Sequence, residues 1–132
     1  MRKQLVFFGL SLLLLLAACG GGQPQISSEL SEFSFGEVVN GEVVTRTISI
    51  SNTGGASLVI DGVSTTCGCT QASLDVTRIA PGSSAELTIQ FDSGAHGPEA
   101  NGELTRQVYI ASNDPAQPEL MIEFDALVLA AD

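Results

Sequence analysis

The sequence predicts an all-β fold, a two-sheet antiparallel β-sandwich of about seven strands in residues 33–129. Apolar residues alternate with polar ones in several short runs, and this period of two is typical of strands with one buried and one solvated face. Clusters of Asn, Asp, Gly and Pro separate the runs, and no segment after residue 18 has the spacing of a helix. Short strands separated by regular turn signals are typical of a sandwich.

The alternating runs predict strands in chain order. Isoleucine alternates with threonine and serine at residues 47–51, and a short apolar run follows at 58–60. Further runs lie at 86–91, 108–110 and 122–128. The apolar positions of each run share one face of the strand, so we expect them to form the core. These positions are Ile48, Ile50, Leu58, Ile60, Leu87, Ile89, Phe91, Val108, Ile110, Ile122 and Phe124.

Turn-forming residues lie between these runs. They are Asn40-Gly41, Asn52-Thr53-Gly54-Gly55, Ala80-Pro81-Gly82, Asn101-Gly102 and Asn113-Asp114-Pro115. In the last of these turns we expect the side chains to bond the local backbone, because the dense acidic pattern of a calcium-binding loop is absent.

The first 18 residues have the features of a bacterial lipoprotein signal peptide. Two basic residues precede an apolar stretch that is shorter than the roughly 20 residues a membrane-spanning helix needs. The stretch ends in Leu16-Ala17-Ala18-Cys19, the pattern of a lipobox. We therefore expect cleavage between Ala18 and Cys19 and lipid on the sulfur of Cys19. The alternative is an ordinary signal peptide, cut at the same bond, with Cys19 left unmodified.

A lipid on Cys19 would hold the mature protein at a membrane of the cell envelope. In a cell with two membranes, Gly20 favours the outer membrane, with the protein facing the periplasm or the surface. Residues 19–32 begin with glycines and glutamines, so we expect them to form the lipidated cysteine and a flexible tether. The folded domain is expected to follow, in residues 33–129.

The charge of the mature chain excludes anionic partners. Removal of the signal peptide leaves three arginines and no lysine against 15 acidic residues, which is a net charge of −12. Nucleic acid and anionic lipid headgroups would be repelled, so neither is expected to bind the domain. The same acidity keeps a tethered domain soluble.

Several short motifs occur in the order found in a known family. They are Phe35-Gly36-Glu37-Val38, Ile50-Ser51-Asn52-Thr53-Gly54, Leu58-Val59-Ile60, Cys67-Gly68-Cys69-Thr70, Ile79-Ala80-Pro81-Gly82, Phe91-Asp92 and Ser112-Asn113-Asp114-Pro115. Over nearly all of residues 33–128 the chain resembles the bacterial family called domain of unknown function 1573. That family is similar in turn to the immunoglobulin-like modules of cilia-associated, major-sperm-protein-type and choice-of-anchor proteins. The resemblance implies an immunoglobulin-like sandwich and, because the family has no established activity, implies none here.

Residues 93–101 depart from the family pattern. They make the connection between Phe91-Asp92 and Gly102 longer than the family's usual one. Such a loop is either a neutral insertion or the place where one member gains a function of its own.

Cys67 and Cys69 are the cysteines of the expected domain. Their spacing would place both sulfurs on one face of a strand, in a compartment where thiols oxidise. Three interpretations are open: a structural disulfide or packed thiols, a redox pair, and a copper(I) site in which two thiolates bind the soft metal. The Cys-x-Cys motif has no second half elsewhere in the chain, which favours the structural interpretation.

His96 is the only histidine of the chain. It would complete a metal site if it lay beside Cys67 and Cys69, but no pattern sets its distance from them. A lone histidine in a glycine-rich loop is more often simply solvated.

Catalysis is not expected. The chain has no Gly-x-Ser-x-Gly turn, no glycine-rich phosphate loop before a helix, and no pair of carboxylates that spacing singles out. The function we expect is that of a lipid-anchored, non-enzymatic module, without a cofactor, that binds or positions another envelope protein through its sheet edges and loops. The alternative function is thiol-redox chemistry or copper(I) handling by the Cys-Gly-Cys motif.

Overall fold

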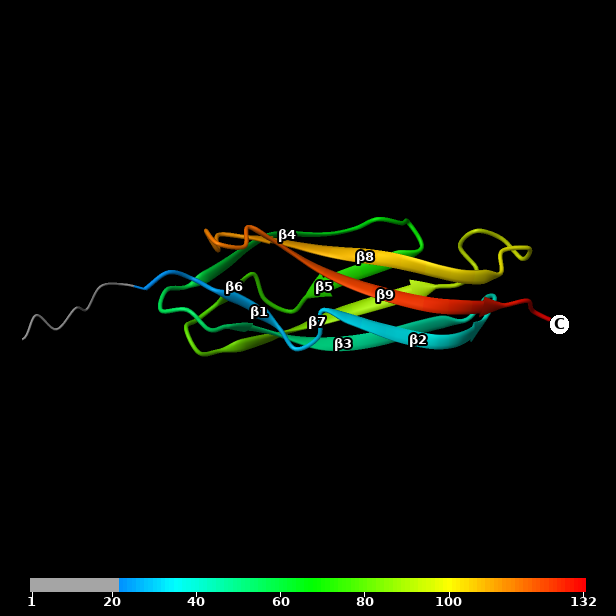
Figure 1. Ribbon diagram of the computed structural model, residues 1–132, viewed down its shortest axis with the longest axis horizontal. Coiled ribbons are helices and arrows are strands. Elements are labelled where there is room, and N and C mark those ends of the chain that lie inside the picture. The colour runs from blue at the N-terminus through cyan, green and yellow to red at the C-terminus, as the bar shows by residue number, and fades with distance from the viewer. Residues whose placement is uncertain (1–21) are drawn as a thin grey trace, which may run out of the picture.

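The computed structural model describes residues 22–132, which fold into two β-sheets packed face to face (Figure 1). This part of the chain contains nine strands and no helix, and therefore no helix long and apolar enough to cross a membrane. The strands are β1 (Ile26–Ser28), β2 (Glu32–Val39), β3 (Val43–Asn52), β4 (Leu58–Thr65), β5 (Thr70–Leu74), β6 (Arg78–Ile79), β7 (Ser84–Asp92), β8 (Gly102–Ser112) and β9 (Glu119–Leu129). The all-β sandwich expected from the sequence is confirmed.

The two sheets hold four and five strands. Their strand orders are β1-β3-β7-β5 and β2-β9-β8-β4-β6. Every pair is antiparallel except β2 and β9, which run parallel, so the expectation of an entirely antiparallel sandwich is wrong for this pair. Parallel neighbours need a long connection, and here almost the whole domain lies between β2 and β9.

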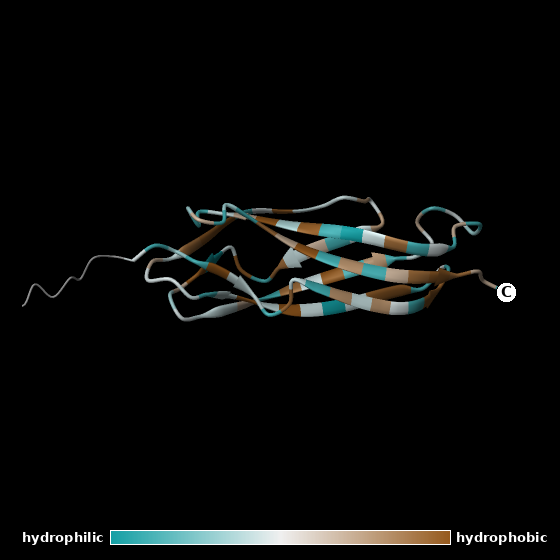
Figure 2. Ribbon diagram, in the orientation of Figure 1, coloured by the Kyte–Doolittle hydropathy of each residue, from teal (hydrophilic) through white to brown (hydrophobic). Residues whose placement is uncertain are grey.

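The buried faces of the two sheets pack against each other and form a single hydrophobic core. All eleven residues that the period-two runs predict to be core residues are buried. Hydrophilic and hydrophobic positions alternate along the strands, as Figure 2 shows. Phe33 of β2 packs against Phe124, and Phe35 of β2 packs against both Phe91 and Phe124, with ring centroids 5.2–6.2 Å apart. These aromatic contacts tie β2 to both sheets.

The expectation that residues 19–32 form a flexible tether is wrong for the second half of this range. Ile26–Ser28 form β1, which pairs with the end of β3, and Ile26 is buried. The carbonyl of Gln23 also accepts a hydrogen bond of 3.0 Å from Gly55 N–H, and a Cβ at Gly54 would collide with that same carbonyl. A three-residue edge strand is too short to show a period of two, which is why the sequence pattern missed it.

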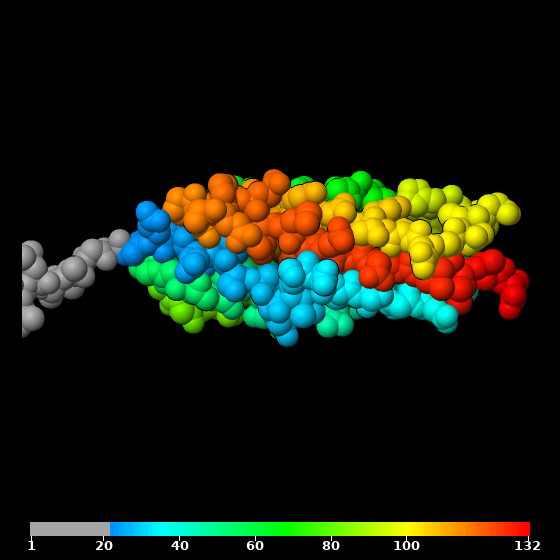
Figure 3. Space-filling view, viewed as in Figure 1, coloured from blue at the N-terminus to red at the C-terminus, as the bar shows by residue number. Residues whose placement is uncertain are grey.

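The two ends of the sandwich carry different parts of the chain. The first described residues lie at one end of the long axis, and loop 93–101 lies at the other, with the C-terminal residues (Figures 1 and 3). Three connections near the loop end cross from one sheet to the other: β2 to β3, β4 to β5, and β7 to β8. Cys67 and Cys69 lie in the second of these connections, and His96 lies in the third.

Candidate functional site

The Cys67-Gly68-Cys69 motif forms the turn between β4 and β5. The expectation that both cysteines lie on a strand is wrong, because β4 ends at Thr65 and β5 begins at Thr70. Hydrogen bonds hold the turn: Thr65 Oγ1 donates to the carbonyls of Cys67 and Thr70, at 3.0 and 3.1 Å, and Thr70 N–H donates to the Cys67 carbonyl. Gly68, which has no side chain, is exposed at the tip.

Cys67 and Cys69 form a disulfide. Their sulfurs are 2.06 Å apart and their Cα atoms 5.1 Å apart, within the usual range for bridged cysteines. The two sides of the bridge differ in environment: Cys69 is 3% exposed and belongs to the core, whereas Cys67 is only partly buried. Cys69 N–H donates a hydrogen bond of 3.1 Å to the sulfur of Cys67.

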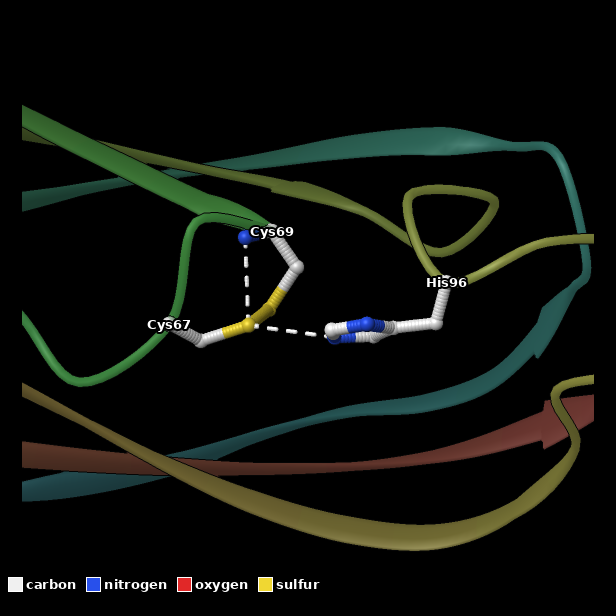
Figure 4. A group of neighbouring side chains, drawn as sticks. All are labelled: Cys67, Cys69 and His96. Atoms are coloured by element: carbon white, nitrogen blue, oxygen red, sulfur yellow. Dashed lines mark hydrogen bonds between the residues drawn. A yellow bond between two sulfur atoms is a disulfide. The ribbon is translucent and has the colours of Figure 1, made fainter.

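His96 lies beside the disulfide. Its Nε2 is 3.3 Å from Cys67 Sγ, although the two residues are 29 positions apart in the chain. Figure 4 shows the imidazole ring directed at the disulfide. A disulfide sulfur carries no proton, so Nε2–H is the donor in this contact. The sequence pattern could not set this distance, and the structure brings together all three residues of the proposed metal or redox site. The expected cleavage and lipidation residues, Ala18 and Cys19, lie outside the described residues.

Residues far from the motif hold His96 in place. Ser93 Oγ donates to the carbonyls of Val39 and Glu42, at 3.0 and 2.8 Å, at the start of the loop. Asn40 Nδ2 donates to the carbonyl of Gly97, at 3.0 Å, directly after His96. Loop 93–101 is thus fastened to the β2–β3 turn. The local sequence pattern identifies Asn40 only as a turn residue and does not single out Ser93, because these long-range bonds leave no mark in it.

The three side chains have the donor types that suit copper(I). One ligand atom from each of Cys67, Cys69 and His96 lies within 4.8 Å of the other two. Thiolate and imidazole are ligands that copper(I) accepts, whereas the sulfurs of a disulfide are not thiolates. These residues would therefore hold the metal only after the disulfide is reduced.

An open groove runs beside the disulfide. Its volume is about 480 Å³, and its lining residues are Thr66, Cys67, Gly68, His96, Thr105, Arg106 and Gln107. Ladder pairing between β4 and β8 ends at Thr65 and Val108, and Thr66 then bonds to the backbone of Gln107. The Gln107 carbonyl accepts a hydrogen bond of 3.1 Å from Thr66 N–H, and Gln107 N–H donates one of 3.2 Å to Thr66 Oγ1. Arg106 Nη1 donates to the Thr105 carbonyl at 2.8 Å, while its buried Nε has no hydrogen-bond partner among the described residues.

The fold recurs in solved structures. A protein of unknown function from Porphyromonas gingivalis W83 superposes with a TM-score of 0.74 at 25% identity, over 86% of this chain and 51% of that one. The chain thus spans about half the length of that protein. A PapD-like domain of human CEP192 matches with a TM-score of 0.64 at 11% identity, over 83% of this chain and 89% of that one. The periplasmic chaperone SfaE gives a TM-score of 0.54 at 10% identity, over 82% of this chain and 58% of that one.

The likenesses at 10–11% identity establish the fold alone, which is immunoglobulin-like and PapD-like. No curated protein matches the chain. One family model matches residues 26–128, a range that begins at β1 and so includes the strand that the sequence pattern missed. The chain belongs to the family described as protein of unknown function (DUF1573).

Proposed function

We propose that this protein is a lipid-anchored, non-enzymatic module of the bacterial cell envelope that binds another envelope protein by adding one of that protein's strands to β5. The observation that carries the proposal is the edge of β5. Among residues 22–132 its backbone has no neighbouring strand on one side, and the strand has none of the features with which proteins block an open edge.

The other three edge strands, β1, β2 and β6, are short or have features that oppose strand addition. β1 and β6 have three and two residues, and β6 contains Arg78. β2 carries glutamates and a register shift between Ser34 and Glu37, with Gly36 at a φ of 71°. In contrast, the five residues of β5 include no charge, no proline and no bulge.

The free groups of β5 can be assigned from its pairing with β7. The Cys69 carbonyl accepts a hydrogen bond from Asp92 N–H, and backbone groups alternate sides along a strand. Gln71 and Ser73 therefore direct their N–H and C=O groups to β7, whereas Ala72 and Leu74 direct theirs outward. An incoming strand would bond to these outward groups, as in other β-strand additions.

The fold supports a protein-binding role. Two of the similar structures are chaperones, one of them periplasmic. The anchoring part of the proposal rests on the Leu16-Ala17-Ala18-Cys19 pattern. A lipid at Cys19 would tether the end of the sandwich where β1 begins and leave the opposite end, with loop 93–101, directed away from the membrane (Figure 1).

The anchor is tested by replacing Cys19 with serine. The expected result is loss of the protein from the membrane fraction, or accumulation of the unprocessed chain, because serine cannot form the thioether. An unaltered, membrane-bound and processed variant would contradict lipidation at Cys19.

The binding edge is tested by photo-crosslinking in intact cells. A photoreactive amino acid at position 71 on β5 should crosslink a distinct envelope protein, whereas the same probe at position 45 on β3 should not. Thr45, Gln90 and Gln71 lie directly opposite one another across β3, β7 and β5, so both probes share one sheet face.

A matched pair of charge variants completes the test. Gln71→Lys with Ser73→Lys should abolish the crosslink, because lysine on an edge strand opposes strand addition. Thr45→Lys with Thr47→Lys adds the same charge on the same face of a central strand and should preserve it. Equal crosslinking from both positions, or equal loss in both variants, would refute binding at β5.

A second candidate function is copper(I) binding by the reduced cysteine pair. The grouping of Cys67, Cys69 and His96 within 4.8 Å favours it. The protein, reduced and kept anaerobic, should then take up one equivalent of copper(I) in competition with a chromophoric chelator. Uptake should vanish in the Cys67→Ser, Cys69→Ser double variant and weaken in His96→Ala. Uptake that is the same in all three proteins would exclude this site.

A further inference from the structure

We propose that the Cys67–Cys69 disulfide is a thiol–disulfide exchange site that oxidises a pair of thiols on another protein, with Cys67 as the sulfur that is attacked. This inference is independent of strand addition at β5, because it rests on the turn, His96 and the adjoining groove.

The two sulfurs differ in access. Cys69 is 3% exposed and packs in the core, whereas Cys67 is partly exposed and lines the groove. Exchange proceeds by direct attack of a thiolate on one sulfur, so access decides which sulfur reacts. The geometry makes Cys67 the entry point and Cys69 the sulfur that departs.

The surroundings of Cys67 favour its thiolate. Two donors already point at Cys67 Sγ in the disulfide: His96 Nε2–H at 3.3 Å and Cys69 N–H at 3.1 Å. Hydrogen bonds to an ionised sulfur are stronger than those to a neutral one. The donors therefore stabilise the reduced site more than the disulfide, and stabilisation of the reduced form makes a disulfide a stronger oxidant.

The departing sulfur also has a partner. Cys69 Sγ lies 3.5 Å from Thr70 Oγ1, whose hydroxyl can donate to a thiolate. Neither sulfur is therefore released into an entirely apolar site, in spite of the burial of Cys69.

The exchange proceeds in two steps. A thiolate of the partner protein attacks Cys67 Sγ: a bond forms between these two sulfurs, the Cys67–Cys69 bond breaks, and its electron pair leaves with Cys69, which takes up a proton from water. The partner's second thiol loses its proton to water and attacks the partner's first sulfur, releasing Cys67 as a thiolate. The partner loses two electrons and gains a disulfide, and Cys67 and Cys69 gain the two electrons.

The groove offers a place for the partner's cysteine-bearing segment. The attacking thiolate is an anion, and a chain of net charge −10 repels anions. Arg106 lines the groove together with Cys67 and His96 and supplies a positive charge there.

The first test uses the full-length protein in detergent and oxidised glutathione as the probe. Cys69→Ser leaves the accessible Cys67 thiol and should form a mixed disulfide with glutathione, measured by intact mass. Cys67→Ser leaves the buried Cys69 thiol, which should react at least about tenfold more slowly. Equal rates in the two variants would overturn the assignment of Cys67 as the reacting sulfur.

The second test keeps both cysteines and alters exposed residues, so it does not depend on the folding of a core variant. The protein is equilibrated with mixtures of reduced and oxidised glutathione, quenched with acid, and its free thiols are alkylated and counted. His96→Ala should shift the equilibrium about tenfold toward the disulfide, because the reduced form loses a hydrogen bond to a charged sulfur. Asn101→Ala, an exposed change in the adjoining turn, should leave it unchanged.

Two results of this second test would overturn the proposal. One is a disulfide that stays oxidised at every ratio of reduced to oxidised glutathione, which indicates a purely structural bridge. The other is an equilibrium that His96→Ala does not shift, which would show that the contact between His96 and Cys67 does not favour the reduced form.

Discussion

The carboxylate of Asp114 accepts a hydrogen bond of 2.9 Å from the backbone N–H of Ile26, a residue 88 positions earlier in the chain. Its other oxygen accepts from the N–H groups of Ala116 and Gln117, at 2.8 and 3.1 Å. The turn between β8 and β9 thus holds β1 against the sandwich. The local part of this pattern follows from the sequence, whereas the bond to Ile26 does not.

Replacing Asp114 with alanine should lower the free energy of unfolding by about 1–3 kcal/mol, because the buried N–H of Ile26 loses its acceptor. Chemical denaturation of the variant and the parent measures the difference. Asp61→Ala removes an exposed carboxylate from β4 and should cost less than about 0.5 kcal/mol. Equal effects of the two substitutions would show that the contact with β1 contributes nothing.

Stability should also depend on pH through Asp114. The hydrogen bond from Ile26 N–H, opposed by burial and aided by the bonds from Ala116 and Gln117, lowers the pKa of this carboxyl group below its ordinary value. The folded state then binds a proton less readily than the unfolded state, so the stabilisation is complete above the unfolded pKa of about 3.9. It is lost as the pH falls through the lower folded pKa.

Denaturation midpoints measured between pH 7 and pH 2 check this dependence. In Asp114→Asn the decline in stability below about pH 4 should be shallower than in the parent, because the variant has no carboxyl group to titrate at this position. Parallel curves would contradict the assignment to Asp114.

The sequence predicted the core well, for a simple physical reason. A strand with one buried face must alternate, and strands such as β7 and β9 are long enough to display the alternation. Phe91 is an example: it is 1% exposed, its ring stacks on Phe35, and it packs at a tilt against Phe124. Phe91→Ala should cost about 3–5 kcal/mol in a denaturation experiment. A midpoint that barely moves would contradict its place in the core.

The candidate site was predictable only in part. A Cys-Gly-Cys motif is visible in any reading of the chain, but the turn that places it and the loop that brings His96 to it depend on bonds between distant residues. Asn40 and Ser93 make such bonds, and both are ordinary turn or loop residues by type. Local patterns describe which face of a strand is buried, whereas they carry no information on which loop meets which turn.

Asn52 illustrates the same limit within a motif of the family. It is 1% exposed and its amide makes four hydrogen bonds: Oδ1 accepts from the N–H groups of Gln25 and Gly54, and Nδ2 donates to the carbonyls of Ala56 and Ile79. The local sequence pattern places Asn52 only in a turn, whereas its side chain also fixes the segment that leads into β1.

The isosteric change Asn52→Asp tests this role. It turns the donating nitrogen into an acceptor facing two carbonyl groups, so it should lower the free energy of unfolding by about 2–4 kcal/mol. Asn101→Asp makes the same chemical change at an exposed position and should cost less than about 0.5 kcal/mol. Thermal or chemical denaturation of the two variants distinguishes the effects, and similar losses would contradict the structural role of the Asn52 amide.

Removal of both cysteines separates a structural disulfide from a reactive one. The Cys67–Cys69 bridge closes a loop of only three residues, so in the chain-entropy description its removal costs roughly 1–2 kcal/mol. The Cys67→Ser, Cys69→Ser double variant should therefore retain the cooperative unfolding of the parent with a modestly lower midpoint, while losing all exchange with glutathione. Circular dichroism and denaturation measure the first property and thiol alkylation the second. A double variant that fails to fold would show that the bridge is a structural requirement of the β4–β5 turn.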